Sequence, residues 1–92
     1  MIERGYLERI ARDIAARTTR VELNGESIPI RSAEANGTTV TVYTDMVAGI
    51  TRITSIRIID ERGDVIVQRT PYVDVVDSQQ LEFRFEFEVK GA

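Results

Sequence analysis

A strictly alternating segment, LEFRFEFEV at residues 81–89, constrains the fold of this chain more than any other feature. Side chains in a β-strand point alternately to opposite faces, so the pattern predicts a strand with one apolar and one charged face. All three phenylalanines of the protein lie on the apolar face, which comprises Leu81, Phe83, Phe85, Phe87 and Val89. A strand of this kind needs a second layer to cover its apolar face. We expect that layer to be a helix or a second sheet.

The N-terminal segment has the pattern of an amphipathic helix. Its apolar residues recur at spacings of three to five, which places them on one helical face; they are Ile2, Tyr6, Leu7, Ile10, Ile14 and Ala15. We expect the helix over about residues 6–18. It should begin after Gly5, because glycine costs about 1 kcal/mol relative to alanine in a helix interior. The β-branched pair Thr18 and Thr19 should end it. Such a helix usually covers a sheet, and packing against a second copy of itself is the alternative.

Residues 19–90 have the character of antiparallel strands joined by tight turns. Two Asn-Gly pairs, at 24–25 and 36–37, are strong signals for two-residue hairpins. Pro29 follows the first pair and lacks a backbone N–H, so we expect its strand to lie at an edge of the sheet. A further turn, DERGD at 60–64, should return the chain antiparallel.

The β-branched run ITRITSIRIID at residues 50–60 changes its apolar phase between Ile53 and Ile56. This change indicates a bulge or a strand that switches faces. Altogether the chain should form a single domain, residues 1–92, of the α+β class. It should contain an N-terminal amphipathic helix followed by five or six antiparallel strands in a small sheet or sandwich. A chain of 92 residues without cysteine has a small core and no disulfide, which favours efficient packing or self-association.

Composition excludes several classes of function. The chain has no histidine and no cysteine, so Ser-His-Asp and Cys-His catalysis and thiolate metal sites are ruled out. We therefore expect no enzyme, no cofactor and no metal site. The net charge of −3 argues against nucleic-acid binding, because single-strand binders need a basic groove with exposed aromatic side chains. No apolar run approaches the roughly 20 residues that span a bilayer, and no signal peptide is apparent, so we expect no membrane partner.

Charge is distributed unevenly along the chain, and this distribution suggests where it makes contacts. Residues 1–20 hold five arginines against three acids, whereas residues 60–92 hold four basic residues against eight acids. Arginine favours bidentate pairing with carboxylates. We therefore expect ion pairs between the helix, or a neighbouring subunit, and the acidic strand face. The candidate interface residues are Arg9, Arg12, Arg17, Glu82, Arg84 and Glu86.

Other polar groupings have simpler explanations. The acids of the alternating strand lie two residues apart, within reach of one cation, but a solvated face with Arg84 as their ion partner requires the same pattern. Asp60, Glu61 and Asp64 do not have the spacing of a calcium loop, and turn chemistry accounts for them. Tyr43 and Tyr72 could stack on a sugar, although packing also explains them.

Three stretches resemble a group of small phage and prophage proteins encoded among tail and baseplate genes. They are ERIARDIAARTTRVELNG, VAGITRITSIRIIDERGDVI and LEFRFEFEV. In that group a helix with the pattern L-x-x-I-A-x-D-I precedes V-x-x-I-T-x-I-x-L-x-D-x-x-G-x-V-I, and an alternating strand closes the protein. The matching residues here are Leu7, Ile10, Ala11, Asp13, Ile14, Ile53, Thr54, Ile56, Ile58, Asp60, Gly63, Val65 and Ile66. The group has no established active site, so no catalytic residue is carried over. Some members are labelled ketopantoate hydroxymethyltransferase, an activity that belongs to a barrel of about 250 residues.

The resemblance implies a non-enzymatic structural or assembly component of a phage or prophage virion, in the tail or baseplate region. Its partners would be further copies of itself or other virion proteins. It would be made in the cytoplasm of the bacterial host and act in the assembling virion. The alternative is a β-rich module that binds a carbohydrate or a peptide.

Overall fold

A computed structural model describes residues 2–47, 49–74 and 82–90. One helix, α1 (Arg4–Arg17), is followed directly by the strands β1 (Thr18–Leu23), β2 (Glu26–Asn36), β3 (Thr39–Thr44), β4 (Arg52–Ile53), β5 (Ile56–Asp60), β6 (Val65–Arg69), β7 (Val73–Asp74) and β8 (Arg84–Glu88). Six of the strands form an antiparallel sheet in the order β6-β5-β1-β2-β3-β8, and β4 pairs with β7 apart from it. The α+β class and the helix-first order are confirmed.

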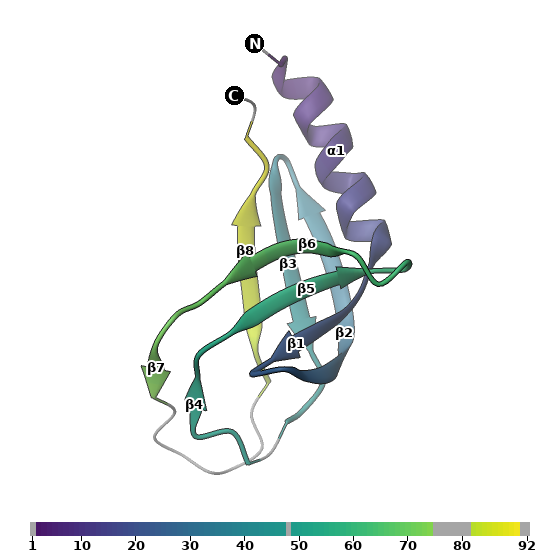
Figure 1. The fold of residues 1–92 in the computed structure, drawn as a ribbon. Coiled ribbons are helices and arrows are strands. Elements are labelled where there is room, and N and C mark those ends of the chain that lie inside the picture. The colour runs from purple at the N-terminus through teal and green to yellow at the C-terminus, as the bar shows by residue number, and fades with distance from the viewer. Residues whose placement is uncertain (1, 48, 75–81, 91–92) are drawn as a thin grey trace.

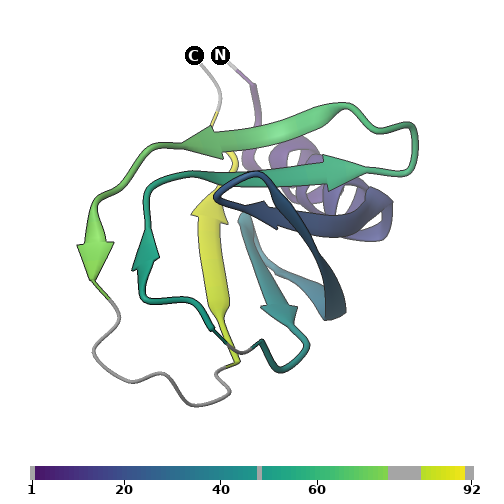
Figure 2. The ribbon, with the colours of Figure 1, turned by 60° about the horizontal axis from the view of Figure 1, so that its bottom comes forward.

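The sheet is strongly curled. In Figure 1, β5 and β6 cross in front of β8, β3 and β2, and the helix runs beside β2 and β3, against which it packs. The view in Figure 2 shows the same β1-β5-β6 layer crossing over the layer that contains β3 and β8. The concave side of the sheet and one face of the helix therefore share a single core.

Three β-bulges accompany this curl. The register slips by one residue at Thr19 in β1, at Arg31 in β2 and at Ile66 in β6, where a residue has no direct partner on the neighbouring strand. A bulge bends its strand and increases the local twist. The Thr19 hydroxyl also donates hydrogen bonds to the carbonyls of Ile59 and Asp60, at 3.2 and 2.9 Å, which ties the bulge to β5.

The core consists of inward-facing residues from the six-stranded sheet, the helix and β4. Its buried members are Ala11, Val21, Leu23, Ile28, Val40, Val42, Ile53 and Ile58, and the apolar residues of β8 pack against them half-buried. Phe85 lies opposite Val42 and Phe87 opposite Val40 in the β3–β8 ladder. The alternation of the C-terminal segment is thus confirmed for residues 82–89, because its odd-numbered side chains face inward and its even-numbered ones are exposed. Leu81 lies outside the described residues.

Both Asn-Gly signals mark hairpins, in two different ways. Asn24 and Gly25 are the two central residues of the β1–β2 turn, with φ of 54° and 84°, as a type I′ turn requires. At the second site the turn residues are Gly37 and Thr38, one position further along. There Gly37 alone has positive φ, at 62°, which is the signature of a type II′ turn.

The prediction that the Pro29 strand lies at an edge is wrong. Strand β2 is an interior strand, between β1 and β3. Its first part pairs with β1 as far as Pro29, and its second part pairs with β3 from Ile30 onward. Pro29 therefore lies where the strand leaves one neighbour and joins the other. Its carbonyl still accepts the Asp45 N–H at 3.1 Å, and the missing donor falls at the end of a ladder.

The helix also begins earlier than expected, at Arg4 rather than after Gly5. Gly5 is in the first turn, where few intrahelical bonds depend on it, and the Glu3 carbonyl accepts the N–H groups of Tyr6 and Leu7. The expected end is confirmed. The Thr18 hydroxyl donates to the Ile14 carbonyl at 2.8 Å, and the chain passes from helix to strand without a loop.

The phase change between Ile53 and Ile56 is a strand break. Strand β4 ends at Ile53 and β5 begins at Ile56, and the two strands belong to different sheets. Strand β7 lies between Pro71 and the alternating segment, and its Asp74 pairs opposite Arg52. Residues 75–80, which lead from β7 to that segment, lie outside the described residues.

Candidate functional site

The six candidate interface residues lie in two regions of the molecule, three on the helix and three in the C-terminal alternating segment. Arg9 and Arg12 lie on the flank of α1, and Arg17 lies at its C-terminal end. Glu82 precedes β8 and forms an ion pair with Arg31 of β2. The remaining two, Arg84 and Glu86, are on β8 and have exposed side chains. The structure therefore does not gather them into one patch.

The helix flank carries an open concavity. Its volume is ≈ 510 Å³, and it is lined by Tyr6, Arg9, Ile10, Arg12 and Asp13. The Arg9 guanidinium lies over the Tyr6 ring, 5.6 Å from its centroid, as in a cation–π contact. Tyr6 remains 54% exposed, so the start of the predicted apolar stripe faces outward from the core.

The helix touches the sheet most closely at a residue that the apolar stripe omitted. Ala11 is 0% exposed, whereas Leu7, Ile10 and Ile14 are only half-buried. A methyl side chain at this position allows the helix backbone to approach the sheet. The signal for Ala11 was present, since it lies four residues after Leu7 on the same face, but alanine is a weak marker of burial in a sequence pattern.

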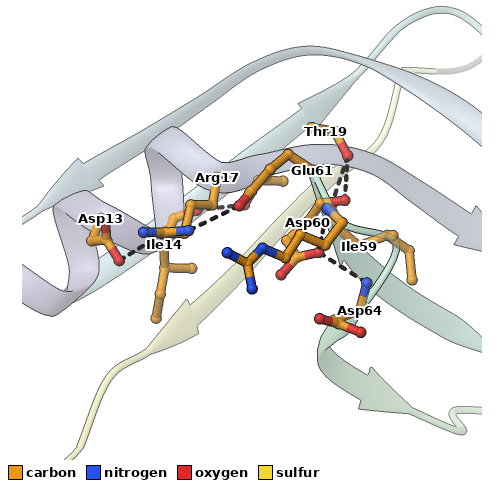
Figure 3. A network of polar contacts seen from close by, with 10 residues as sticks. Asp13, Ile14, Arg17, Thr19, Ile59, Asp60, Glu61 and Asp64 are labelled. Atoms are coloured by element: carbon orange, nitrogen blue, oxygen red, sulfur yellow. Dashed lines mark hydrogen bonds and ion pairs between the residues drawn. The ribbon is translucent and has the colours of Figure 1, made fainter.

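A polar network joins the end of the helix to the β5–β6 turn (Figure 3). Arg17 reaches Asp13 through Nε at 2.9 Å and Glu61 through Nη1 at 2.8 Å. Asp13, by hydrogen bonding and by charge, and Glu61 raise the pKa of Arg17 above its usual value. The sequence predicted ion pairs between the helix and the acidic strand face, whereas this pair joins the helix to the β5–β6 turn of the same chain.

The acidic turn after β5 is held by its own side chain. Asp60 Oδ1 accepts the N–H groups of Arg62 and Asp64, both at 2.9 Å, and Gly63 has a φ of 84°. The Asp60 carboxylate is thus occupied in a turn, which confirms the turn interpretation. Within the residues that the structure describes, no three His, Cys, Asp or Glu side chains lie together as a metal site would require.

A second ionic cluster was not predicted. Glu22 of β1 contacts Arg57 of β5 at 3.2 Å and Arg20 of its own strand at 3.9 Å. The Nε atoms of both arginines are buried without a hydrogen-bond partner. Glu22 and Arg57 are direct cross-strand partners, and only the β1–β5 register reveals this, because 35 residues separate them.

The two tyrosines proposed for sugar stacking each contact an arginine. The Arg31 guanidinium lies 5.6 Å from the Tyr43 ring centroid, and that of Arg52 lies 4.9 Å from the Tyr72 centroid. Arg52 also forms an ion pair with Asp74 at 2.9 Å. Tyr72 is 68% exposed. Carbohydrate binding at these rings stays a prediction.

A small groove lies between the two ends of the curled sheet. It has a volume of ≈ 150 Å³ and is lined by residues of β5, β6 and β8, namely Ile56, Ile58, Val67, Arg69, Arg84, Phe85, Glu86 and Phe87. Strands β6 and β8 are the terminal strands of the sheet order, so the curl brings its opposite ends to one groove. Strand β5 contributes only apolar residues to this lining, whereas β6 and β8 each contribute both apolar and charged residues. This groove and the β8 edge beside it form the strongest candidate for a contact surface.

Comparison with known proteins identifies two relatives in Bacillus subtilis (strain 168), each named an uncharacterized protein. XkzA is 42% identical over 89 residues, which are 97% of this chain and 99% of the relative. YqcB is 39% identical over 89 residues, with the same coverage. No protein-family model matches the chain, and no solved structure matches it. No helix in the described ranges has the length and apolar character needed to cross a membrane.

Proposed function

The chain belongs to one protein family with XkzA and YqcB of Bacillus subtilis, and we propose that it is a non-enzymatic assembly component of a phage or prophage virion. We place it in the tail or baseplate region, where it acts through protein–protein contacts. The resemblance of its helix, its central strands and its alternating C-terminal strand to small tail-region proteins supports this proposal.

One structural observation carries the proposal. Strand β8 ends the sheet, so among the residues that the structure describes no strand pairs with the backbone N–H and C=O groups on one side of it. Its phenylalanines are half-buried rather than enclosed, and Phe85 and Phe87 line the adjoining groove. An open edge beside an apolar groove is the arrangement through which sheet proteins take up a further strand. This geometry suits assembly better than catalysis.

The polar side chains also support a role without catalysis. The described carboxylates with defined contacts serve in ion pairs or turns: Glu8, Asp13, Glu22, Asp60, Glu61, Asp74 and Glu82. The chain contains no histidine, the side chain that most often acts as a general base near neutral pH.

The test is to induce a host strain that carries the gene and to purify the particles. We expect mass spectrometry to find the protein in the particles or in tail assembly intermediates, and deletion of the gene to lower the infectious titre. A matched deletion complemented from a plasmid should restore the titre. Absence of the protein from both fractions, together with an unchanged titre, would overturn the proposal.

A further inference from the structure

The edge formed by β8 is unusually regular. Its five-residue ladder with β3 runs from Arg84 to Glu88 without a register shift. The other end of the sheet, β6, has a bulge at Ile66, and Pro71 follows shortly after it. Bulges and prolines protect an edge from adding strands, and β8 has neither. Of the two ends of the sheet, β8 is the one open to further pairing.

The backbone groups on the free side of β8 can be identified. Thr44 donates its N–H to the Phe83 carbonyl at 2.9 Å, and Val89 donates to the Thr38 carbonyl at 2.8 Å. Because bonding groups alternate in direction along a strand, the odd-numbered residues of β8 bond to β3. The even-numbered residues Arg84, Glu86 and Glu88 therefore present their N–H and C=O groups at the free edge.

The charges on this edge are self-complementary. If two β8 strands pair antiparallel about a twofold axis at Phe85, Arg84 of each copy lies opposite Glu86 of the other. Both residues are exposed, and neither forms an ion pair among the described residues. The same register keeps all apolar side chains on one face and makes Arg84 and Glu86 a hydrogen-bonded pair, as their outward backbone groups require. Glu88 then faces Glu82 of the other copy, whose charge is already balanced by Arg31.

The pairing also places the apolar side chains of the two β8 strands next to each other. The two Phe85 residues meet as a non-hydrogen-bonded pair, the kind whose side chains come closest, with about 4.5 Å between Cα atoms. The adjoining groove measures ≈ 150 Å³ and is lined by Phe85, Phe87 and Ile58. In the proposed pairing the Phe85 ring of the second copy lies beside the apolar residues of this groove.

From these observations we propose that the protein forms a twofold-symmetric dimer in which β8 of one copy pairs antiparallel with β8 of a second, centred on Phe85, with reciprocal Arg84–Glu86 ion pairs. The pairing joins two six-stranded sheets into one. It uses both β8 edges, so the assembly closes at two copies. The bulged β6 strands remain the terminal strands in the joined sheet order. The idea that a second copy is the partner in assembly rests on the proposed function, whereas the β8 pairing itself rests on the geometry of the strand.

Charge exchange tests the register. The variants Arg84→Glu and Glu86→Arg each turn two attractive pairs into two repulsive ones, so sedimentation equilibrium from about 10 µM to about 1 mM should show dimerisation weakened at least about tenfold. Mixing the two variants in equal amounts should restore a dimer. In the mixed dimer the introduced glutamate of one copy faces the introduced arginine of the other, and the native Glu86 of the first faces the native Arg84 of the second. The double variant Arg84→Glu/Glu86→Arg should also dimerise. No other register predicts both recoveries.

Matched controls are Arg62→Glu, in the exposed β5–β6 turn, and Glu26→Arg, at the exposed start of β2. Both make the same charge changes away from β8 and should dimerise as the unaltered protein does. A protein that stays monomeric to about 1 mM, single variants that dimerise normally, or a mixture that does not recover would each overturn the inference. Those results leave the virion proposal standing, because the protein's presence in particles is measured separately.

Discussion

Asn24 shows how much one residue contributes to this fold. It adopts positive φ in the β1–β2 turn, and its side chain also holds a distant segment. Its amide donates to the Arg52 carbonyl at 2.6 Å, and its oxygen accepts from the N–H and hydroxyl of Thr54, at 2.8 and 3.1 Å. The Asn-Gly turn was evident from the sequence. The link to residues 52–54 was not, because it depends on a contact across 28 to 30 residues.

We expect Asn24→Gly to reduce the free energy of unfolding by about 1–2 kcal/mol. Glycine keeps the positive φ, so the loss isolates the side-chain hydrogen bonds from the turn geometry. Asn24→Asp keeps the acceptor but loses the amide donor, so its stability should lie between that of the unaltered protein and that of Asn24→Gly. Urea denaturation followed by circular dichroism measures the difference. A glycine variant as stable as the unaltered protein would show that the side-chain contacts contribute nothing.

Arg17 provides the second residue-scale prediction, for the ion pairs in Figure 3. Its raised pKa means that the stability contributed by these pairs is present below the ordinary arginine value and is lost only as the pH rises through the raised one. Alkaline pH within the usual working range should therefore leave them intact. Salt is the useful probe, because all three side chains are exposed.

We expect Arg17→Gln to lower the melting temperature slightly at low ionic strength and to have little effect in roughly 1 M salt, where the screening length is about 3 Å. Thermal unfolding at both salt concentrations measures this change. Arg12→Gln is the control, since Arg12 forms no ion pair among the described residues. An effect of Arg17→Gln that does not change with salt would indicate packing rather than charge.

At the scale of elements, the junction between α1 and β1 orients the helix against the sheet. The helix ends at Arg17 and the strand begins at Thr18, so no loop allows the two to move independently. The Thr18 hydroxyl caps the helix, and the Thr19 bulge bonds to β5. The sequence predicted where the helix ends because β-branched residues favour strands. The sequence did not predict how closely the helix approaches the sheet. The small side chain of Ala11 determines that distance.

The close approach leads to a prediction for the helix. Ala11→Leu should destabilise the protein by about 1–3 kcal/mol, because the added side chain has to displace a packed sheet. Ala16→Leu is the matched control on the exposed side of the same helix, and it should be nearly neutral. Chemical denaturation of both variants measures the difference. Equal stabilities would mean that the helix moves away from the sheet at little cost.

At the scale of the whole molecule, the curl of the sheet decides which surfaces remain open. The sheet begins and ends with β6 and β8, and its curl brings both to one groove. The phenylalanines are half-buried because β8 has a neighbour on one side only. The alternating pattern predicted which side of the strand faces inward, but its position in the sheet follows from pairing with β3, about 40 residues earlier.

Amide hydrogen exchange offers a prediction at this scale. In a dilute solution the N–H groups of Arg84 and Glu86 should exchange quickly, because they point to the free edge, whereas those of Phe85 and Phe87 should be protected by β3. Raising the protein concentration should slow exchange at the N–H groups of Arg84 and Glu86 and leave exchange at those of Phe85 and Phe87 unchanged. The odd-numbered amides thus serve as an internal control. Uniform exchange along the strand at every concentration would contradict the assigned bonding directions.

The sequence alone determined the features that depend on neighbouring residues. These are the helix and its end at Thr18, the Asn24-Gly25 turn, the Asp60 turn and the inward face of the last strand. Local backbone preference and the two-residue period of a strand are sufficient for each of them. Of the candidate interface residues, the pattern predicted that Arg84 and Glu86 are exposed.

Only the tertiary structure decided strand order, and with it the remaining features. Pro29 is interior because its strand changes neighbours there, and β5 separates from β4 because the two belong to different sheets. Likewise, Glu22 meets Arg57, and Phe85 meets Val42, through registers between distant segments. Such pairings are selected by the packing of the whole core, because many strand orders satisfy the same local alternation and a single curled sheet buries these particular faces together.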